Sequence, residues 1–323
     1  MKIVITGGAG FIGANLVRVL LEQKPTWTVD VIDNLSTGDR ANLDVCDGVQ
    51  LHEASILDEF VLRHAVGGAD AVVHLAARPS VQRSIVDPFA SHDVNATGTM
   101  RVLEACRGAG VGHVIVASSS SVYGATTALP KHEALPTRPL SPYAASKLAT
   151  EAYALAHSHC YGMSTLVFRF FNVFGPLQPA GHAYAAAIPA FLSAALRERP
   201  IPVFGDGLQT RDFTYVDSLC AVVTDALRRR VSSDRPVNLA FGTRRSLLDV
   251  IDTMSELMGR RLERVHSEAR PGDVRDSQAD TSQLRALFPD LEPVDFATGL
   301  GATIEWFRSA RAPDPVGAGA PQT

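Results

Sequence analysis

The segment TGGAGFIG places glycines at three-residue intervals directly after the apolar run 2–6. Gly7 allows a tight turn, Gly10 lets the backbone approach a pyrophosphate, and Gly13 lets the next helix pack close to the strand. Apolar residues recur at helical spacing over 14–23, so we expect a helix whose N-terminus favours negative charge. This strand, turn and helix predict a dinucleotide-binding unit.

An acidic residue stands about 20 positions beyond the glycines, as dinucleotide recognition requires. Asp33 ends a second apolar run, 28–33, where its carboxylate can accept hydrogen bonds from an adenosine ribose. A carboxylate at this position repels a 2′-phosphate. The sequence therefore predicts NAD rather than NADP as the cofactor.

Further apolar runs over 70–76, 113–118 and 164–171 alternate with helix-like segments such as 94–110. Near-continuous apolar strands separated by helices indicate a parallel sheet covered on both faces. We therefore predict an α/β fold, a doubly wound parallel Rossmann sheet with a smaller α+β substrate-binding lobe.

The predicted domain boundaries follow from a change in composition after about residue 172, where Pro and Gly become more frequent. The predicted NAD-binding Rossmann domain covers 1–171 and is rejoined by about 212–240, with a helix within 211–230. The predicted nucleotide-sugar-binding lobe covers 172–211 and 241–309, and 310–323 is predicted to be a disordered tail.

The composition is that of an ordinary soluble globular chain, with 46% hydrophobic and 20% charged residues and a net charge of −4. This balance argues against nucleic acid or a membrane surface as a partner. The apolar N-terminus is interrupted by glycines and reads as a strand rather than a signal peptide. The cysteines form no CxxC pair, so we expect no metal site and reduced thiols in a cytoplasmic protein.

A reactive pair is predicted in the segment SPYAASK. Ser141 can cap a helix and Pro142 fits its first turn, which places Tyr143 and Lys147 one turn apart on one face. A lysine ammonium and a positively charged nicotinamide nearby both favour the phenolate of a tyrosine. Tyr143 could then act as a base near neutral pH.

The glycine spacing GxxGxxG, the YxxxK pair and several motifs in order resemble the extended short-chain dehydrogenase/reductases, in the UDP-sugar branch of the NAD-dependent epimerase/dehydratase family. The motifs are VIDNLSTG (31–38), VVHLAARPSV (72–81), VNATGT (94–99), RFFNVFGP (169–176), RDFTYVD (211–217) and RPGDVRDSQAD (270–280). The resemblance implies an isomerase, a UDP-sugar 4-epimerase.

The resemblance also implies the site residues. Tyr143, Lys147 and Ser119, the last counted back from the VYG of ASSSSVYG, are the implied catalytic residues. The implied cofactor-binding residues are Gly7, Gly10, Phe11, Ile12, Gly13, Asp33, Asn34, Ser36, Thr37, Gly38, Ser55, Ile56, Leu75, Ala76, Ala77, Asn95, Ser118, Tyr143, Lys147 and Phe170. The implied substrate-binding residues are Ser119, Ser120, Tyr143, Asn172, Ala187, Ile188, Val203, Phe204, Arg211, Arg270, Asp273 and Ser277.

The family's shared first step removes the O4 proton of the sugar to Tyr143 while C4 gives a hydride to NAD⁺. In related 4,6-dehydratases the strand-end motif resembles TDEVYG, in which Asp and Glu before VYG supply an acid and a base. This chain has Ser120 and Ser121 there, which favours epimerisation. A UDP-sugar dehydratase (4,6 or 5,6) with its acid and base elsewhere stays an alternative. A non-catalytic NAD-binding protein is disfavoured, because such proteins usually lose the Tyr or the Lys.

The implied diphosphate ligands are Arg211 and Arg270, whose guanidinium groups suit phosphate oxygens. Asn172 matches a residue at the sugar diphosphate, Phe204 an aromatic that stacks on uracil, and Asp273 a residue near the uridine ribose.

Ser277 bears on which sugar the enzyme accepts. Epimerases restricted to plain hexoses have a bulky Tyr at the position of Ser277, so a small residue leaves space for a 2-acetamido group. The stretch 181–191 also resembles epimerases that accept N-acetylated sugars. We therefore expect a UDP-hexose or a UDP-N-acetylhexosamine as the substrate.

UDP-glucuronate 4-epimerase is a further alternative. Such enzymes often have a threonine in place of Asn172 and an arginine a few residues later, whereas this chain reads GPLQPAG. The expected protein partner is a second copy of the chain, because the helices around 92–107 and 143–161 resemble those that pair in the family's homodimers.

Overall fold

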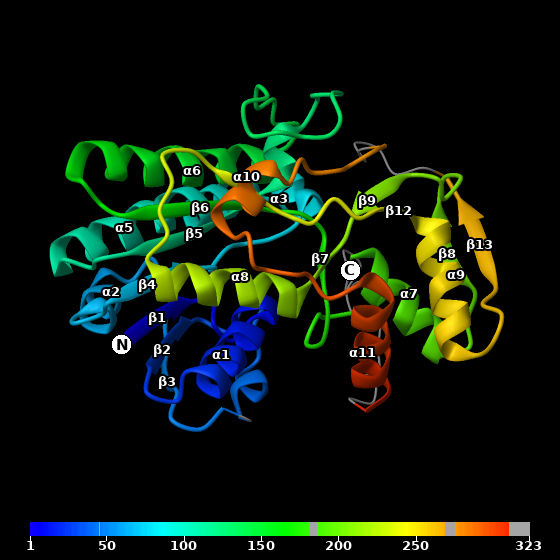
Figure 1. The fold of residues 1–323 in the computed structure, drawn as a ribbon, viewed down its shortest axis with the longest axis horizontal. Coiled ribbons are helices and arrows are strands. Elements are labelled where there is room, and N and C mark those ends of the chain that lie inside the picture. Colours follow the sequence, from blue (N-terminus) through cyan, green and yellow to red (C-terminus); the bar gives the residue numbers. More distant parts are fainter. Residues whose placement is uncertain (45, 181–185, 269–274, 310–323) are drawn as a thin grey trace, which may run out of the picture.

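The computed structural model describes residues 1–44, 46–180, 186–268 and 275–309 of the chain. The tail predicted at 310–323 lies outside these residues. In Figure 1 the chain forms a larger layered α/β part on the left, which contains the N-terminus, and a smaller lobe on the right.

The larger part is built on one parallel sheet of seven strands in the order β11-β6-β5-β4-β1-β2-β3. The strands are β1 (Lys2–Thr6), β2 (Thr28–Asp33), β3 (Gln50–Glu53), β4 (Ala71–His74), β5 (Val114–Ser119), β6 (Thr165–Phe170) and β11 (Val237–Leu239). This arrangement confirms the predicted Rossmann sheet, and the chain order reverses between β1 and β4. Ligands bind beyond the carboxyl ends of the strands at such a reversal.

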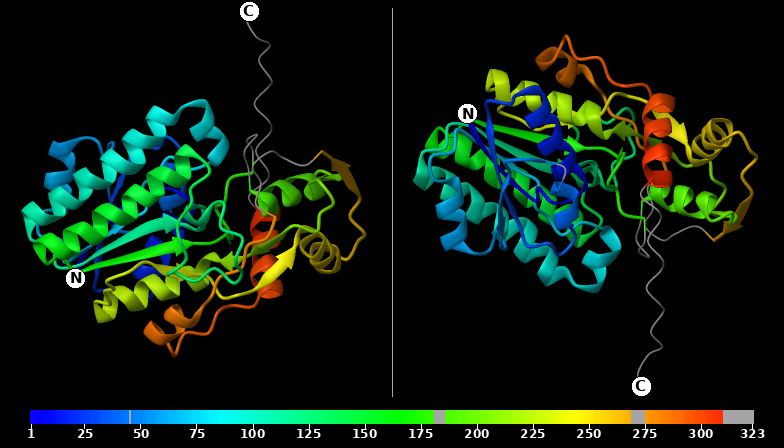
Figure 2. Two further views of the ribbon diagram at one scale, coloured as in Figure 1. Left: turned by 90° about the horizontal axis from the view of Figure 1, so that it is seen from above. Right: turned by 90° about the horizontal axis from the view of Figure 1, so that it is seen from below.

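Alternate residues of each strand point to opposite faces, and each face has its own core. Ile3 and Ile5 face α1 (Phe11–Gln23) and α8 (Val216–Arg229). Val4 faces the other layer, which consists of α2 (Glu59–Val66), α5 (Gly98–Ala109) and α6 (Pro142–Tyr161). Figure 2 shows these two helical layers on either side of the sheet.

The helix expected over 94–110 is two elements in the structure. A π-helical turn, η2 (Asp93–Thr97), precedes α5. Such turns inside α-helices are frequently found at functional sites. The short helices α3 (Val81–Val86) and α4 (Pro88–His92) lead into it and pack against α6, and the 3₁₀ turns η1 (Arg40–Leu43) and η3 (Ser120–Tyr123) follow strand ends.

The smaller lobe contains three two-stranded pairings. They are β7 (Val173–Phe174) with β10 (Thr214–Tyr215), β8 (Ile201–Phe204) with β13 (Arg264–Ser267), and β9 (Thr210–Asp212) with β12 (Arg244–Ser246). Helices α7 (Ala187–Leu196), α9 (Leu247–Met258) and α11 (Phe296–Ser309) pack around them, and α10 (Ser282–Leu287) lies against β11. A capping box between Ser246 and Asp249 fixes the start of α9.

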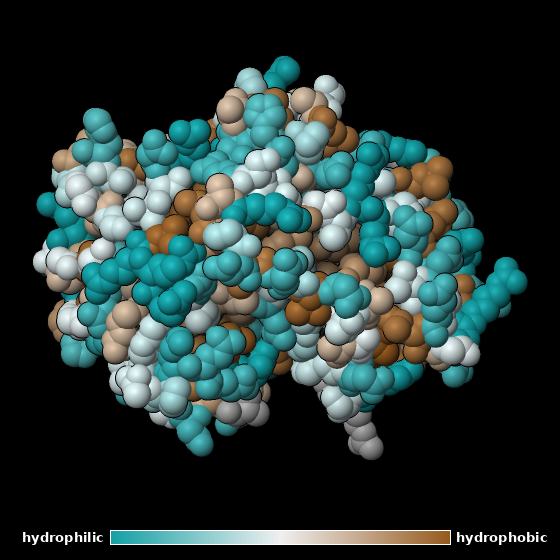
Figure 3. Space-filling model, in the orientation of Figure 1, coloured by the Kyte–Doolittle hydropathy of each residue, from teal (hydrophilic) through white to brown (hydrophobic). Residues whose placement is uncertain are grey.

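The face in Figure 3 is covered mostly by hydrophilic side chains, with smaller apolar groups between them. None of the described helices is both long enough and apolar enough to span a membrane. The described residues also contain no group of His, Cys, Asp or Glu side chains that could hold a metal ion.

Candidate active site

The glycine turn after β1 leaves no room for side chains. Gly7 has φ +74°, and a Cβ on it would lie 2.7 Å from the backbone nitrogen of Ala76. A Cβ on Gly13 would lie 2.2 Å from the carbonyl oxygen of Gly7. Glycine is therefore required at both positions, and the bare turn forms a cradle at the N-terminus of α1.

Asp33 is buried at the end of β2, beside this turn. Its Oδ2 accepts a hydrogen bond from the amide of Ala9 at 3.0 Å, and its Oδ1 accepts one from the amide of Leu35 at 2.9 Å. These bonds fix the carboxylate at the rim of the turn. Its negative charge stands where the sequence predicts contact with an adenosine ribose.

A first cavity of about 850 Å³ opens beyond the carboxyl ends of the strands. The predicted cofactor-binding residues that line it are Gly7, Gly10, Phe11, Ile12, Gly13, Asp33, Asn34, Ser36, Thr37, Ser55, Ile56, Leu75, Ala76, Ala77, Ser118, Tyr143, Lys147 and Phe170. The bare glycine cradle and the acidic rim fit an extended dinucleotide.

Two predicted cofactor residues lie behind this lining. Gly38 packs against the backbone of Ala9. Asn95 is buried, and its side chain accepts from the amide of Arg78 at 2.7 Å and donates to Ser146 Oγ at 2.9 Å. Asn95 thus fixes the loop after β4 to helix α6, and its contact with a cofactor stays a prediction.

The predicted reactive pair, Tyr143 and Lys147, lies on α6. Ser141 caps the helix by accepting from the amide of Ala144 at 3.1 Å, and Pro142 occupies the first turn. The ammonium of Lys147 is buried and donates to the carbonyl of Ala117 at 2.8 Å. Burial lowers the pKa of Lys147 to about 8, although the nearby carboxylate of Glu151 raises it.

Tyr143 stands one turn before Lys147, and Ser119 ends the neighbouring strand β5. Burial raises the pKa of Tyr143, and a hydrogen bond with Ser119 lowers it. Ser119 Oγ also accepts from the hydroxyl of Ser121 at 2.9 Å and from its amide at 3.2 Å. A cation close to Tyr143, such as a nicotinamide, favours the phenolate further.

A second cavity of about 880 Å³ lies between the sheet and the smaller lobe. The predicted substrate-binding residues that line it are Ser119, Ser120, Tyr143, Asn172, Ala187, Ile188, Phe204, Arg211 and Ser277. The residues that line both cavities are Ser119, Ser120, Tyr143, Phe171, Asn172, Val173 and Gln178. The two cavities therefore meet at the predicted reactive tyrosine.

Comparison with known proteins decides the family. The model of the NAD-dependent epimerase/dehydratase family matches residues 3–240. The chain belongs to this family. A UDP-glucose 4-epimerase of Mycolicibacterium smegmatis is 35% identical over 317 residues, covering 96% of this chain and 99% of the relative. A dTDP-glucose 4,6-dehydratase of Streptomyces griseus is 32% identical over 316 residues, covering 96% and 95%.

A solved structure shows the same fold throughout. The UDP-N-acetylglucosamine 4-epimerase of Methanobrevibacter ruminantium M1, in complex with UDP-N-acetylmuramic acid, is 32% identical with a TM-score of 0.90. The alignment covers 96% of this chain and 98% of that one. Because the family is NAD-dependent, the cofactor of this chain is NAD. The glycine cradle agrees with this cofactor.

Three predicted substrate residues do not appear in the lining. Val203 is fully buried in the core of the lobe, because on β8 it alternates with Pro202 and Phe204, which do line the cavity. Contact of Val203 with substrate therefore stays a prediction. Arg270 and Asp273 lie outside the described residues, so their roles stay predictions.

The sequence reasoning missed two polar residues of this epimerase/dehydratase site. Gln178 lines both cavities, and its buried Oε1 has no hydrogen-bond partner in the part of the chain that the structure describes. Lys131 lines the second cavity. The GPLQ stretch, 175–178, begins three residues after Asn172 and could have pointed to Gln178, whereas no local pattern marks Lys131.

Proposed function

We propose that this chain is an NAD-dependent 4-epimerase of a UDP-hexose or UDP-N-acetylhexosamine. The observation that carries the proposal is the meeting of the two cavities at Tyr143 and Ser119, with Lys147 one turn away. Tyr143 and Ser119 line the region that both cavities share, where a sugar in the second cavity would face a cofactor in the first. Relatives with this fold are UDP-sugar 4-epimerases, which supports the same reaction here.

The chain's own residues handle the proton of the sugar O4 hydroxyl. Tyr143 as phenolate accepts this proton and later returns it, and Ser119 holds the reacting oxygen by a hydrogen bond. The buried ammonium of Lys147 keeps positive charge near the phenolate. Bound NAD supplies the reversible hydride acceptance at C4 that the family's chemistry needs.

The lining of the second cavity supports epimerisation over dehydration. Among the described residues that line it, the only carboxylate is that of Asp276. Asp276 accepts from Thr210 Oγ1 at 2.6 Å and from Arg244 at 2.8 Å, so it is already paired. The described lining therefore offers no free acid for elimination, and Ser120 and Ser121 occupy the place before VYG. Dehydration stays the alternative function, because one relative is a dTDP-glucose 4,6-dehydratase.

The remaining substrate contacts are part of the same proposal. Arg211 and Arg270 bind the diphosphate together with Asn172, Phe204 stacks on uracil, and Asp273 binds near the ribose. Of these, Arg211, Asn172 and Phe204 line the second cavity, which supports their assignment.

We propose that the active form is a homodimer in the cytoplasm. Large apolar side chains are exposed on α3 and α4, with Ile85 at 64%, Val86 at 77% and Phe89 at 82% exposure. Both helices pack against α6, the element that the family resemblance places at the interface. The four cysteines, Cys46, Cys106, Cys160 and Cys220, are free thiols, which fits a reducing compartment.

The test is product identification by mass spectrometry and NMR. Purified protein with added NAD is incubated separately with UDP-Glc, UDP-GlcNAc and UDP-GlcA, and Tyr143→Phe serves as the inactive control. We expect a product of unchanged mass with inverted C4, at a rate that Tyr143→Phe lowers by about 10²–10⁴. A product that has lost one water would make the chain a dehydratase. Inversion of UDP-GlcA alone would make it a glucuronate epimerase.

A further inference from the structure

Asp212 is a fully buried carboxylate at the end of β9. The residue before it, Arg211, lines the second cavity, whereas Asp212 is not among the described residues that line either cavity. Its donors in the described part of the chain are backbone amides and one hydroxyl rather than a cation. Burial raises the pKa of Asp212 to about 6, and hydrogen bonds from these amides lower it. A carboxylate in such a place costs free energy, so we looked for what it holds together.

The donors to Asp212 come from two segments outside β9. The amide of Ala279 donates to its Oδ2 at 3.0 Å. The hydroxyl of Thr243, between β11 and β12, lies 3.4 Å from its Oδ1 and 2.9 Å from the carbonyl oxygen of Phe213, so one proton is shared between two acceptors. Because β11 belongs to the seven-stranded sheet, Asp212 joins a strand of the smaller lobe to the chain that leaves this sheet.

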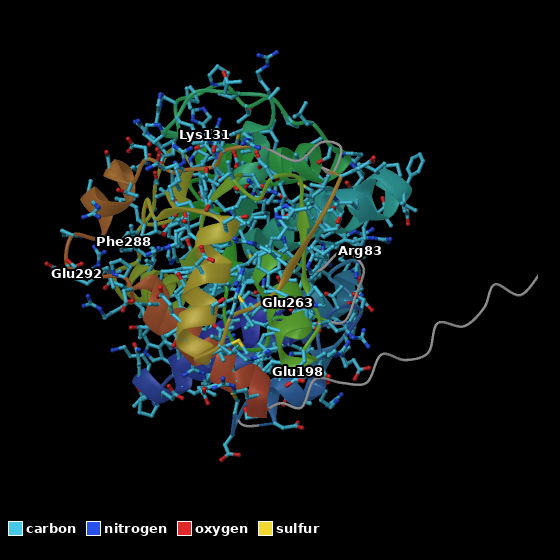
Figure 4. The ribbon with its side chains drawn as sticks, turned by 90° about the vertical axis from the view of Figure 1, so that its right-hand side faces the viewer. Arg83, Lys131, Glu198, Glu263, Phe288 and Glu292 are labelled. Carbon is cyan, nitrogen blue, oxygen red and sulfur yellow. The ribbon has the colours of Figure 1, made fainter. Side chains whose placement is uncertain are left out.

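The segment that carries Ser277 is bound on both sides. The amide of Ser277 donates to the carbonyl of Thr210 on β9 at 3.1 Å. The amide of Asp280 donates at 2.8 Å to the carbonyl of Lys131, which is labelled at the top of Figure 4. Between these two anchors lies Ala279, whose amide reaches the buried carboxylate. Loss of this central bond therefore loosens the chain next to Ser277.

Asp212 also lies among three proposed ligands of the substrate. Arg211 precedes it on β9, and Nδ2 of Asn172 donates to its backbone carbonyl at 3.3 Å. Ser277 stands two residues before Ala279. Arg211, Asn172 and Ser277 line the second cavity from three different segments. Their relative positions depend on how firmly these segments are joined.

We propose that Asp212 is a positioning residue for the nucleotide sugar. Its carboxylate holds the segment of Ser277 against the strand of Arg211, so that both side chains reach one bound substrate. The inference rests on the proposed function and adds to it a residue outside the cavity lining. A carboxylate suits this task because both of its oxygens accept hydrogen bonds, whereas an asparagine amide has one oxygen and turns a donor toward a donor. Its loss therefore weakens substrate binding and leaves the proton transfer at Tyr143 in place.

The experiment compares Asp212→Asn with the wild type, both saturated with NAD. The readouts are KM and kcat for UDP-Glc, UDP-GlcNAc and UDP-GlcA, and the Kd of UDP from titration calorimetry. We expect Asp212→Asn to raise KM and Kd about 10- to 100-fold, the range for hydrogen bonds to a charged group. We expect kcat to stay within about threefold of the wild type, because a loss of binding alone leaves kcat unchanged. A merely structural role would instead lower the amount of active protein, and so kcat, at an unchanged KM.

Two further variants keep the test decisive if Asp212→Asn folds poorly. Thr243→Val removes only the hydroxyl donor and is expected to raise KM and Kd about 2- to 10-fold. Asp225→Asn, whose partners Arg228 and Arg229 lie with it on α8, is the control and is expected to change neither.

Unchanged KM and Kd in Asp212→Asn, or in Thr243→Val where Asp212→Asn does not fold, overturn the inference while the epimerase stands. A wild type that converts none of the sugars overturns the proposed function, and the Kd of UDP then still decides the role of Asp212. A wild type that also binds no UDP overturns both.

Discussion

Glu151 and Arg169 form a buried two-point ion pair one helical turn from Lys147, the proposed catalytic lysine. The Nε of Arg169 lies 2.9 Å from Oε1 of Glu151, and Nη2 lies 2.8 Å from Oε2. Ser118 donates a third bond to Oε1 at 2.5 Å. Glu151 stands one helical turn after Lys147 on α6, so its negative charge supports the ammonium of Lys147.

Glu151→Gln should therefore change both stability and the pH profile. Removing one charge of a buried pair is expected to lower the free energy of unfolding by about 3–5 kcal/mol. It also removes the charge that raises the pKa of Lys147, which burial already holds at about 8. The ammonium is then lost at a lower pH, so the high-pH limb of kcat/KM moves to lower pH.

Urea unfolding and a pH–rate profile measure the two effects. Glu22→Gln, an exposed partner of Arg18, is the matched control and is expected to change neither. A high-pH limb that stays in place would show that Glu151 has only a structural role.

We predict that the burial of His74 makes the protein less stable in acid. Its Nδ1 lies 2.7 Å from Thr6 Oγ1 and its Nε2 lies 3.0 Å from Thr99 Oγ1 in a fully buried site. Burial, helped by the charge of Lys147, lowers the pKa of His74 to about 3. The unfolded chain has an ordinary histidine pKa near 6.5, so only the unfolded state binds this proton between these values. Stability therefore falls as pH falls through this window, by about 1.4 kcal/mol per pH unit.

The contribution of His74 is measured by urea unfolding at a series of pH values from neutral to mildly acidic. In His74→Asn the free energy of unfolding should fall less steeply with decreasing pH than in the wild type. The variant lacks the imidazole that takes up a proton only on unfolding, while its carboxylates are unchanged. His159→Asn, at an exposed position of α6, should keep the wild-type slope. Equal slopes for wild type and His74→Asn would mean that His74 does not carry the acid sensitivity.

Gly13→Ala tests the glycine cradle. The added Cβ would lie 2.2 Å from the carbonyl oxygen of Gly7 and 2.6 Å from the Cα of Gly8, both backbone atoms that cannot swing away. We expect at least a roughly tenfold weaker affinity for NAD, measured by titration calorimetry on protein freed of cofactor, because the turn must shift. In Gly301→Ala the new Cβ meets nothing within 4 Å inside α11. That control should keep its affinity and gain about 1 kcal/mol of stability. An unchanged affinity in Gly13→Ala would mean that the turn tolerates a Cβ.

The sequence predicted the sheet and the placement of Tyr143 and Lys147 on one helix, because both depend on local patterns. Strands 2–6 and 28–33 match β1 and β2, since apolar continuity and the flanking glycines mark them clearly. The π-helical turn η2 leaves the apolar pattern of 94–110 intact, so it was not foreseen. Lys131 reaches the cavity through an isolated bridge to Ala279, far along the chain, and short-range spacing carries no information on such a pairing.

Ser277→Tyr tests the space for an N-acetyl group. Ser277 lines the second cavity with a nearly buried side chain, and its amide is fixed to the carbonyl of Thr210 at 3.1 Å. A tyrosine there would fill the space beside the sugar. We expect kcat/KM for UDP-GlcNAc to fall by about tenfold or more relative to UDP-Glc, a usual size for shape discrimination. Ser232→Tyr, at an exposed position, should leave the ratio unchanged. An equal fall for both sugars would mean that Ser277 does not discriminate between them.

The apolar surface on α3 and α4 predicts the oligomeric state. Ile85 and Phe89 expose most of their side chains, although burial of such residues is strongly favourable. Wild-type protein should show by light scattering twice the chain mass of 34.5 kDa, and Ile85→Glu with Phe89→Glu should show the single-chain mass. Phe60→Glu is the matched control, because Phe60 is 80% exposed but lies on α2, outside the proposed interface. A monomeric wild type would overturn the proposed dimer, and a dimer that only Phe60→Glu disrupts would place the interface elsewhere.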